Sequence, residues 1–168
     1  MFRGCSNLTA APELPAETLS EGCYREMFSS CSNLTAAPEL PAETLSEGCY
    51  QGMFMGCSNL TAAPALPAET LSDSCYRTMF AYCTSLETTP VLHAPTLVKD
   101  CYYDMFFGCA NLSSLTCLAT DIAAENCVFN WLNSVKATGV FYKNSEVGDI
   151  WTGKIPAGWS IQPYAPTT

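Results

Sequence analysis

Acidic side chains recur along this 168-residue chain at intervals of 26 residues. They form two columns: Glu17, Glu43, Glu69 and Glu21, Glu47, Asp73. Carboxylate oxygens are ligands that Ca²⁺ prefers, and a pair of carboxylates is the machinery of glycoside hydrolysis. Stacked units packed roughly 8–10 Å apart hold their carboxylates too far from one another to share an ion. Repetition also places the acids on an open side rather than in a pocket. We therefore expect a solvated acidic face and no metal site.

The chain has one histidine, His93, which stands where three earlier copies of the repeat described below carry a proline. A catalytic triad needs a base beside an activated serine or cysteine, and the sequence around His93 offers no such context. No stretch combines a nucleophile, a base and a concave site. The sequence therefore predicts a protein that is not an enzyme and uses no cofactor.

The eleven cysteines are the other residues with distinctive chemistry. Ten of them form two columns and Cys117 is left over; the columns are Cys5, Cys31, Cys57, Cys83, Cys109 and Cys23, Cys49, Cys75, Cys101, Cys127. No C-x-x-C occurs, so a zinc site of the usual spacing is absent. On a helix Cys23 and Cys31 would lie roughly 12 Å apart, beyond the ~7 Å limit for a disulfide. We expect free thiols that fill the core, with disulfides between adjacent coils as the alternative.

These columns belong to one tandem repeat of 26 residues. Its mark is a Met-Phe pair, which Trp131-Leu132 replaces in the last copy; the pairs are Met1-Phe2, Met27-Phe28, Met53-Phe54, Met79-Phe80 and Met105-Phe106. Self-similarity at this period indicates a solenoid, because a single unit cannot bury its own apolar face. We expect an unbroken register and one continuous core, which columns such as Leu14, Leu40, Leu66, Leu92 and Leu118 would line.

Within one unit, two kinds of element are expected. Asn33 to Ala36 alternates as a short strand, and Pro38 and Pro41 then form an extended corner. Leu45, Cys49 and Met53 follow at i, i+4 and i+8, which is typical of an amphipathic helix. The expected fold is therefore an α/β solenoid with a parallel sheet on one face and helices on the other. We expect residues 1–135 to form the solenoid and residues 136–168 to form a small β-rich cap and tail.

The charge of the chain excludes some partners. Its net charge is −9 with only seven Lys and Arg, which disfavours nucleic acids and anionic membranes. No apolar run reaches the roughly 18 residues of a membrane span, and this chain shows no signal peptide. Met1 falls inside a repeat, so we expect either the C-terminal part of a longer array or a short open reading frame that begins within a repeat. An open first coil with Phe2 and Leu8 uncovered predicts self-association.

A partner-binding surface is hypothesised from aromatic residues beside variable ones. The candidate residues are Tyr24, Arg25, Tyr50, Gln51, Tyr76, Arg77, Tyr102, Tyr103, Trp151 and Trp159. In each copy of the column a constant tyrosine precedes a residue that varies. The alternative is structural: the tyrosines cover the core with their hydroxyls at the rim, and the two tryptophans close the open end of the solenoid.

The stretch Met53-Phe54-Met55-Gly56-Cys57-Ser58-Asn59-Leu60-Thr61, with weaker copies around Cys31, Cys83 and Cys109, resembles the BspA-type leucine-rich repeats of bacterial surface proteins. The resemblance covers residues 1–135. It implies a leucine-rich-repeat solenoid that acts as a non-catalytic module for protein binding or adhesion, on the cell surface or secreted.

Two other functions remain open at this stage. The near identity of the first three copies favours a structural spacer or fibre repeat of a surface or phage appendage. Aromatic residues near the C-terminus, Tyr142, Trp151 and Trp159, favour carbohydrate binding by the cap.

Overall fold

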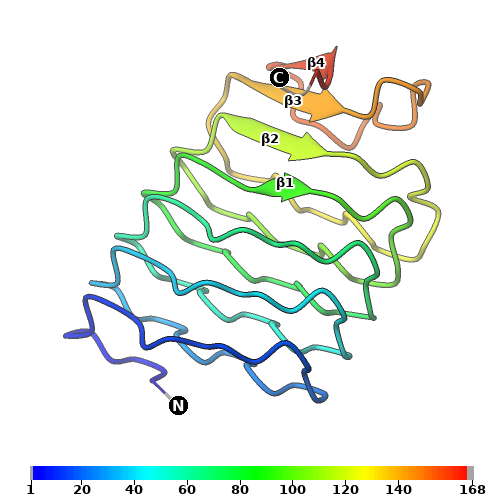
Figure 1. The fold of residues 1–168 in the computed structure, drawn as a ribbon. Coiled ribbons are helices and arrows are strands. Elements are labelled where there is room, and N and C mark those ends of the chain that lie inside the picture. The colour runs from blue at the N-terminus through cyan, green and yellow to red at the C-terminus, as the bar shows by residue number, and fades with distance from the viewer. Residues whose placement is uncertain (1, 166–168) are drawn as a thin grey trace.

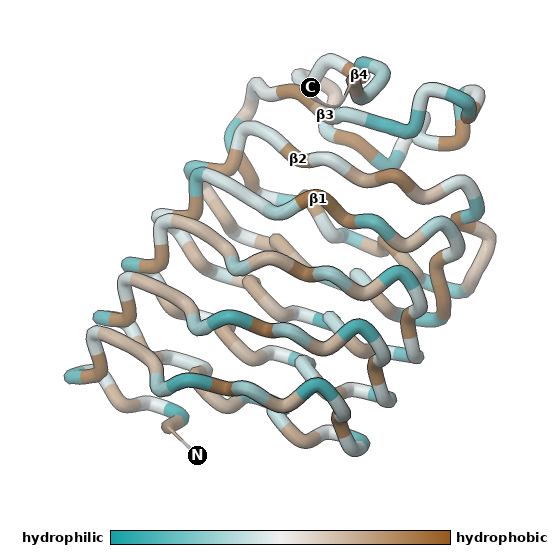
Figure 2. The backbone as a smooth tube through the Cα atoms, viewed as in Figure 1, coloured by the Kyte–Doolittle hydropathy of each residue, from teal (hydrophilic) through white to brown (hydrophobic). Residues whose placement is uncertain are grey.

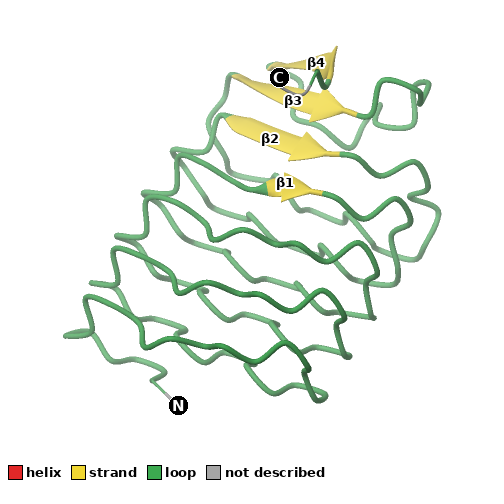
Figure 3. Cartoon of the chain, viewed as in Figure 1, coloured by secondary structure: helices red, strands yellow, loops and turns green. Residues whose placement is uncertain are grey.

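The computed structural model describes residues 2–165, which wind into a stack of coils (Figure 1). Its strands are β1 (Val91–Leu92), β2 (Ser114–Cys117), β3 (Gly139–Lys143) and β4 (Trp159–Pro163). They form one parallel sheet in the order β1-β2-β3-β4. The described residues contain no helix, as Figure 3 shows, and hence no helix able to cross a membrane.

Equivalent residues of successive copies lie on top of one another. The phenylalanine rings stack in a column, with centroids 5.6 Å apart for Phe2 and Phe28 and 5.7 Å apart for Phe28 and Phe54. Single bridges extend the parallel pairing toward the N-terminus, for example between Ala10 and Ala36. Stacking at the period of the repeat is therefore a feature of the fold, and it makes the core continuous from coil to coil.

The predicted α/β leucine-rich-repeat class is wrong, because turns stand where helices were expected. We call this side of the solenoid the turn face; it comprises residues 20–31, 46–57, 72–83, 98–109 and 124–135. In the second segment the amides of Gln51 and Met53 donate to carbonyls three residues earlier, at 3.1 Å each. The amide of Tyr50 instead donates to Cys75 of the next coil, at 3.0 Å. Alternate amides thus close turns within a coil and join it to its neighbour.

Left-handed residues at four-residue intervals explain why no helix forms. In the second segment Gly48, Gly52 and Gly56 have φ of 57°, 61° and 75°. An L-residue pays roughly 1–2 kcal/mol in this region and glycine does not, so glycine is the natural occupant. The same three positions are left-handed in the other full segments, where Ser, Thr, Asp, Asn, Glu or Tyr also occur.

The four-residue turn unit produces the same sequence pattern as a helix. Cys49, Tyr50, Met53 and Phe54 are all buried, so two neighbouring residues of each unit point inward. An i, i+4 spacing of apolar residues therefore follows from the turn repeat as well as from a helix. The predicted apolar stripe exists, but the backbone under it is not helical.

Most cysteines fill the core as thiols. All eleven are free and nine are buried, as expected for small core residues. The Sγ of Cys57 donates to the carbonyl of Phe28 at 3.1 Å, and Cys83 makes the same bond to Phe54. Hydrophobic segments recur on successive coils in Figure 2, in keeping with this repeated core.

On the strand side of the fifth copy the register shifts by one residue, while the turn face keeps the spacing of the earlier copies. Val91 pairs with Thr116 and Leu92 with Cys117, a spacing of 25 positions rather than 26. Cys117 therefore takes the core position predicted for Leu118, which is only half-buried. The predictions of an unbroken register and of a core Leu118 are wrong here, and the cysteine outside the two columns gains a role.

The last coil is shorter than the others. β3 pairs with β2 at the usual spacing, whereas Gly139 pairs with Trp159 only 20 positions later. The rings of Trp131 and Trp151 stack at 5.6 Å and close this end of the core. The sheet runs without a break across residue 135, and a domain boundary at that residue stays a prediction.

Candidate partner-binding surface

Half of the ten predicted surface residues lie inside the protein. Tyr50, Tyr76 and Tyr102 are each 1% exposed, and Trp151 and Trp159 are also buried. The tyrosine rings stack on one another, at 5.8 Å between Tyr50 and Tyr76. Burial raises the pKa of these phenols. The tyrosine column is therefore a part of the core rather than a surface offered to a partner.

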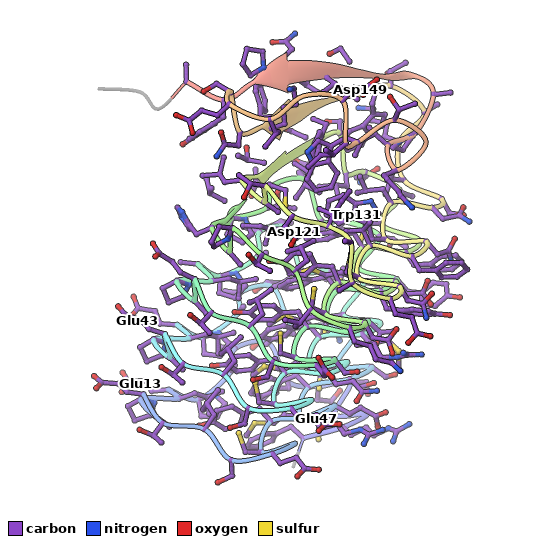
Figure 4. All side chains as sticks on the ribbon, turned by 90° about the vertical axis from the view of Figure 1, so that its right-hand side faces the viewer. Glu13, Glu43, Glu47, Asp121, Trp131 and Asp149 are labelled. Atoms are coloured by element: carbon purple, nitrogen blue, oxygen red, sulfur yellow. The ribbon has the colours of Figure 1, made fainter. Side chains whose placement is uncertain are left out.

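The two tryptophans fasten the last coil. Trp159 Nε1 donates to the carbonyl of Lys136 at 2.8 Å. Trp151 packs edge-on against Phe141 at 4.8 Å as well as on Trp131, and it is fully buried. Trp131, labelled in Figure 4, donates its Nε1 to the carbonyl of Lys154 at 2.9 Å. These rings have no free face for a sugar.

The other predicted residues stay nearer the surface, all on the turn face. Arg25 is exposed, and Tyr24, Gln51, Arg77 and Tyr103 are half-buried. The structure brings two of them together: the guanidinium carbon of Arg77 lies 4.0 Å from the centre of the Tyr103 ring. Arg77 also forms an ion pair with Asp100, at 3.1 Å. Tyr24, Arg25 and Gln51 belong to earlier coils.

Sequence reasoning missed the two most exposed aromatic rings of the turn face. Tyr82 and Phe129 are each 54% exposed. Phe129 stacks on Tyr103 at 5.1 Å, and Tyr82 meets the edge of Phe107 at 5.3 Å. Tyr103 and Phe107 lie four residues apart in one segment. We call Tyr82, Tyr103, Phe107 and Phe129 the aromatic patch.

Tyr82 occupies a position that favours glycine. Its φ is 62°, in the left-handed region where a bulky residue is an outlier. The neighbouring coils carry Gly56 and Gly108 at this position. A Cβ on Gly108 would lie 2.9 Å from Cδ1 of Tyr82, so the glycine leaves room for the tyrosine ring. A tyrosine in a glycine column was the signal in the sequence that could have located the patch.

A groove adjoins the patch at the C-terminal end of the turn face. Its volume is about 510 Å³, and its walls are residues 128–137 and 153–156. Phe129 belongs to both the patch and the groove. Lys136 and Lys154 line the groove and no carboxylate does, which is unusual in a chain of net charge −9.

The acidic columns do not gather into a site. Figure 4 shows Glu43 of one column projecting outward, and Glu43 and Glu47, one from each column, are both exposed. Among residues 2–165 no group of three or more His, Cys, Asp or Glu side chains is placed to hold a metal ion. The thiols are also unsuited to ligation, because burial raises the pKa of Cys57, Cys101 and Cys109 to about 12.

Comparison of this chain with protein-family models, curated proteins and solved structures gives no match in any of the three. The resemblance to BspA-type repeats is therefore carried by the residues of the motif alone.

Proposed function

We propose that this chain is a non-catalytic repeat module that binds a macromolecular partner through the aromatic patch of its turn face. The observation that carries the proposal is the exposure of Tyr82 and Phe129 on neighbouring aromatic rings. Aromatic and arginine side chains dominate the binding energy of protein interfaces. Arg77 lies against Tyr103 and adds a cation to the patch.

The backbone at Tyr82 supports a functional reading. A non-glycine residue in the left-handed region costs roughly 1–3 kcal/mol and persists only where its surroundings hold it in place. Glycine meets the same need without this cost in the two neighbouring coils, at Gly56 and Gly108. An exposed ring that is kept at the expense of stability is more in keeping with binding than with packing.

The cellular setting is proposed from the sequence motif. The stretch from Met53 to Thr61 resembles the repeats of bacterial surface proteins, and on that ground we place the module at a bacterial cell surface. Buried thiols of raised pKa react slowly with oxidants, which suits this setting, since the thiolate is the reactive form.

A structural spacer is the second candidate. The first three copies are nearly identical in sequence, and a spacer requires length rather than a distinctive surface. Carbohydrate binding through Trp151 and Trp159 has less support, because both rings are buried.

The test is adhesion of the chain to a panel of immobilised mucins, matrix proteins and bacterial surface proteins, measured by surface plasmon resonance. We expect at least one panel member to bind, and the double variant Tyr82→Ser/Phe129→Ser to bind it at least tenfold more weakly. The matched control is Gln51→Ser, at the position of Phe129 three coils earlier, which should leave binding unchanged. Absence of binding across the panel, or equal binding by the double variant, would contradict the proposal and favour a spacer.

A further inference from the structure

The groove at the end of the turn face contains an unused row of backbone donors. We call the contact between two successive coils a joint. At the joint before the groove, amides of alternate residues donate to carbonyls of the next coil: Asp104 to Phe129 at 3.0 Å, Phe106 to Trp131 at 3.0 Å and Gly108 to Asn133 at 2.9 Å. The equivalent amides one coil later belong to Asn130, Leu132 and Ser134. Within residues 2–165 none of these three donates a hydrogen bond.

The residues of these three amides line the groove, and Gly153 to Pro156 of the short last coil line it as well. Equivalent amides of the interior coils point toward the next coil, so these donors lie on the side where the last coil is short. A full coil would have placed its carbonyls against these donors, as every interior joint does. Buried or half-buried amides gain free energy from an acceptor, so the row favours a segment that supplies alternate main-chain carbonyls.

The charge and shape of the groove restrict that segment further. Lys136 and Lys154 are exposed at its rim, and neither forms an ion pair with any described residue. Their charges attract carboxylates, since no acid of the groove itself neutralises them. Phe129, with Val135 and Ile155, gives the groove an apolar floor for a neighbouring side chain.

We propose that this groove binds an acidic peptide segment of a partner protein, whose alternate carbonyls accept from Asn130, Leu132 and Ser134 while its carboxylates pair with Lys136 and Lys154. The segment thereby continues the hydrogen bonding between coils by one further layer. This inference rests on the proposed binding function of the turn face and names one partner class and its place on that face.

The experiment uses the full chain and three fluorescein-labelled decapeptides, in which Glu alternates with Val, Leu or Phe. We expect fluorescence anisotropy to show saturable binding of at least one peptide. The corresponding Lys/Val, Lys/Leu and Lys/Phe peptides should bind at least tenfold more weakly. Hydrogen exchange measured by NMR should show new protection at the amides of Asn130, Leu132 and Ser134.

Two double variants with the same net charge distinguish an effect of the groove lysines from an effect of the overall charge of the chain. Lys136→Gln/Lys154→Gln should weaken peptide binding at least tenfold, and Lys99→Gln/Lys143→Gln, which removes two lysines outside the groove, should change it less than twofold. Failure of all three acidic peptides to bind, equal effects of the two variants, or protection confined to other amides would each overturn the proposal.

The outcome is separable from that of the adhesion test. Tyr82→Ser leaves the groove intact, so it should not change peptide binding. If no peptide binds while adhesion still depends on Tyr82, the groove is wrongly assigned and the aromatic patch stands. If the peptides bind while no member of the adhesion panel does, the groove is correctly assigned and the aromatic patch is not a binding site.

Discussion

The first three copies of the repeat, residues 1–78, and the next two, residues 79–130, share a core but differ on the outside. The phenylalanine column runs through both regions, with rings 5.6 Å apart both at Phe2 and Phe28 and at Phe80 and Phe106. On the turn face the early coils carry Arg25, Gln51, Ser30 and Gly56, whereas the later coils carry Tyr103, Phe129 and Tyr82 at the same positions. Exposed aromatic rings on the turn face are thus confined to the diverged half.

This difference shows which parts of the repeat are constrained by stacking. An inward side chain packs against the equivalent side chains of the coils before and after it, so a substitution there disturbs the packing of both. An outward side chain at a turn meets solvent and varies at little cost. The exception is Tyr82, which needs Gly108 beside it and so couples two outward positions of adjacent coils.

The largest expected effect concerns pH and the interior thiols. Burial raises the pKa of Cys57, Cys101, Cys109 and Cys117 to about 12 from an ordinary value of 9.0. Between these pH values the unfolded chain has lost protons that the folded chain keeps. The free energy of unfolding therefore falls by about 1.4 kcal/mol per pH unit for each thiol, and buried tyrosines add to this fall.

Urea unfolding at pH 8, 9, 10 and 11 measures this fall. The contribution of the thiols to the free energy of unfolding should be constant below pH 9 and should drop steeply above it. Cys109→Ala should make the slope shallower, and Cys5→Ser, in the exposed part of the first coil, should not. A midpoint that stays unchanged to pH 11 would show that the thiols are not buried as described.

The second effect contrasts an interior ring with an exterior one. Phe54 is fully buried between two rings of its column, so Phe54→Ala should cost about 3–5 kcal/mol. Phe129→Ala removes a ring that is half in solvent, and its cost should stay near 1 kcal/mol. Guanidinium unfolding of both variants checks the contrast. Similar costs for the two would mean that Phe129 has a structural role.

The third effect concerns Gly108 and its partner. Gly108→Ala places a Cβ 2.9 Å from Cδ1 of Tyr82 and strains a residue at φ 74°, so about 2–3 kcal/mol should be lost. Gly56→Ala meets only ordinary contacts near Ser30, and it should cost about 1–2 kcal/mol.

A double-mutant cycle isolates the steric part. In the background of Tyr82→Ser, Gly108→Ala should cost no more than Gly56→Ala does in the unaltered chain. Thermal unfolding of the four proteins of the cycle gives the coupling. Additive costs would show that the two positions are independent.

The smallest effect involves Arg77. Its guanidinium lies over Tyr103 and pairs with Asp100, so Arg77→Lys should cost about 0.5–1 kcal/mol. Arg25 of an earlier coil stands in the same column and makes no cation–π contact within residues 2–165, so Arg25→Lys should be neutral within error. Equal melting temperatures for both variants would show that the contact of Arg77 with the aromatic patch does not stabilise the fold.

Much of the core could be predicted from the sequence, because columns of Phe, Leu and Cys at a fixed period must stack. The turns in place of helices could not be predicted from the apolar pattern, since a four-residue turn repeat and a helix place the same residues inward. Gly48, Gly52 and Gly56 held the distinguishing information, as a helix does not favour glycine at every fourth residue. Burial of Tyr50, Tyr76 and Tyr102 was also open, because a tyrosine suits a rim as well as a core.

The sequence by itself determined the period of this protein, the stacking of its coils and the identity of most core residues, because repetition turns one unit's pattern into neighbours in space. Only the tertiary structure decided the rest: turns on one face, the shift that brings Cys117 inward, and the short last coil with its open donors. The physical reason is that these features depend on hydrogen bonds between residues about 25 positions apart, such as Tyr50 to Cys75, and local pattern does not specify such bonds.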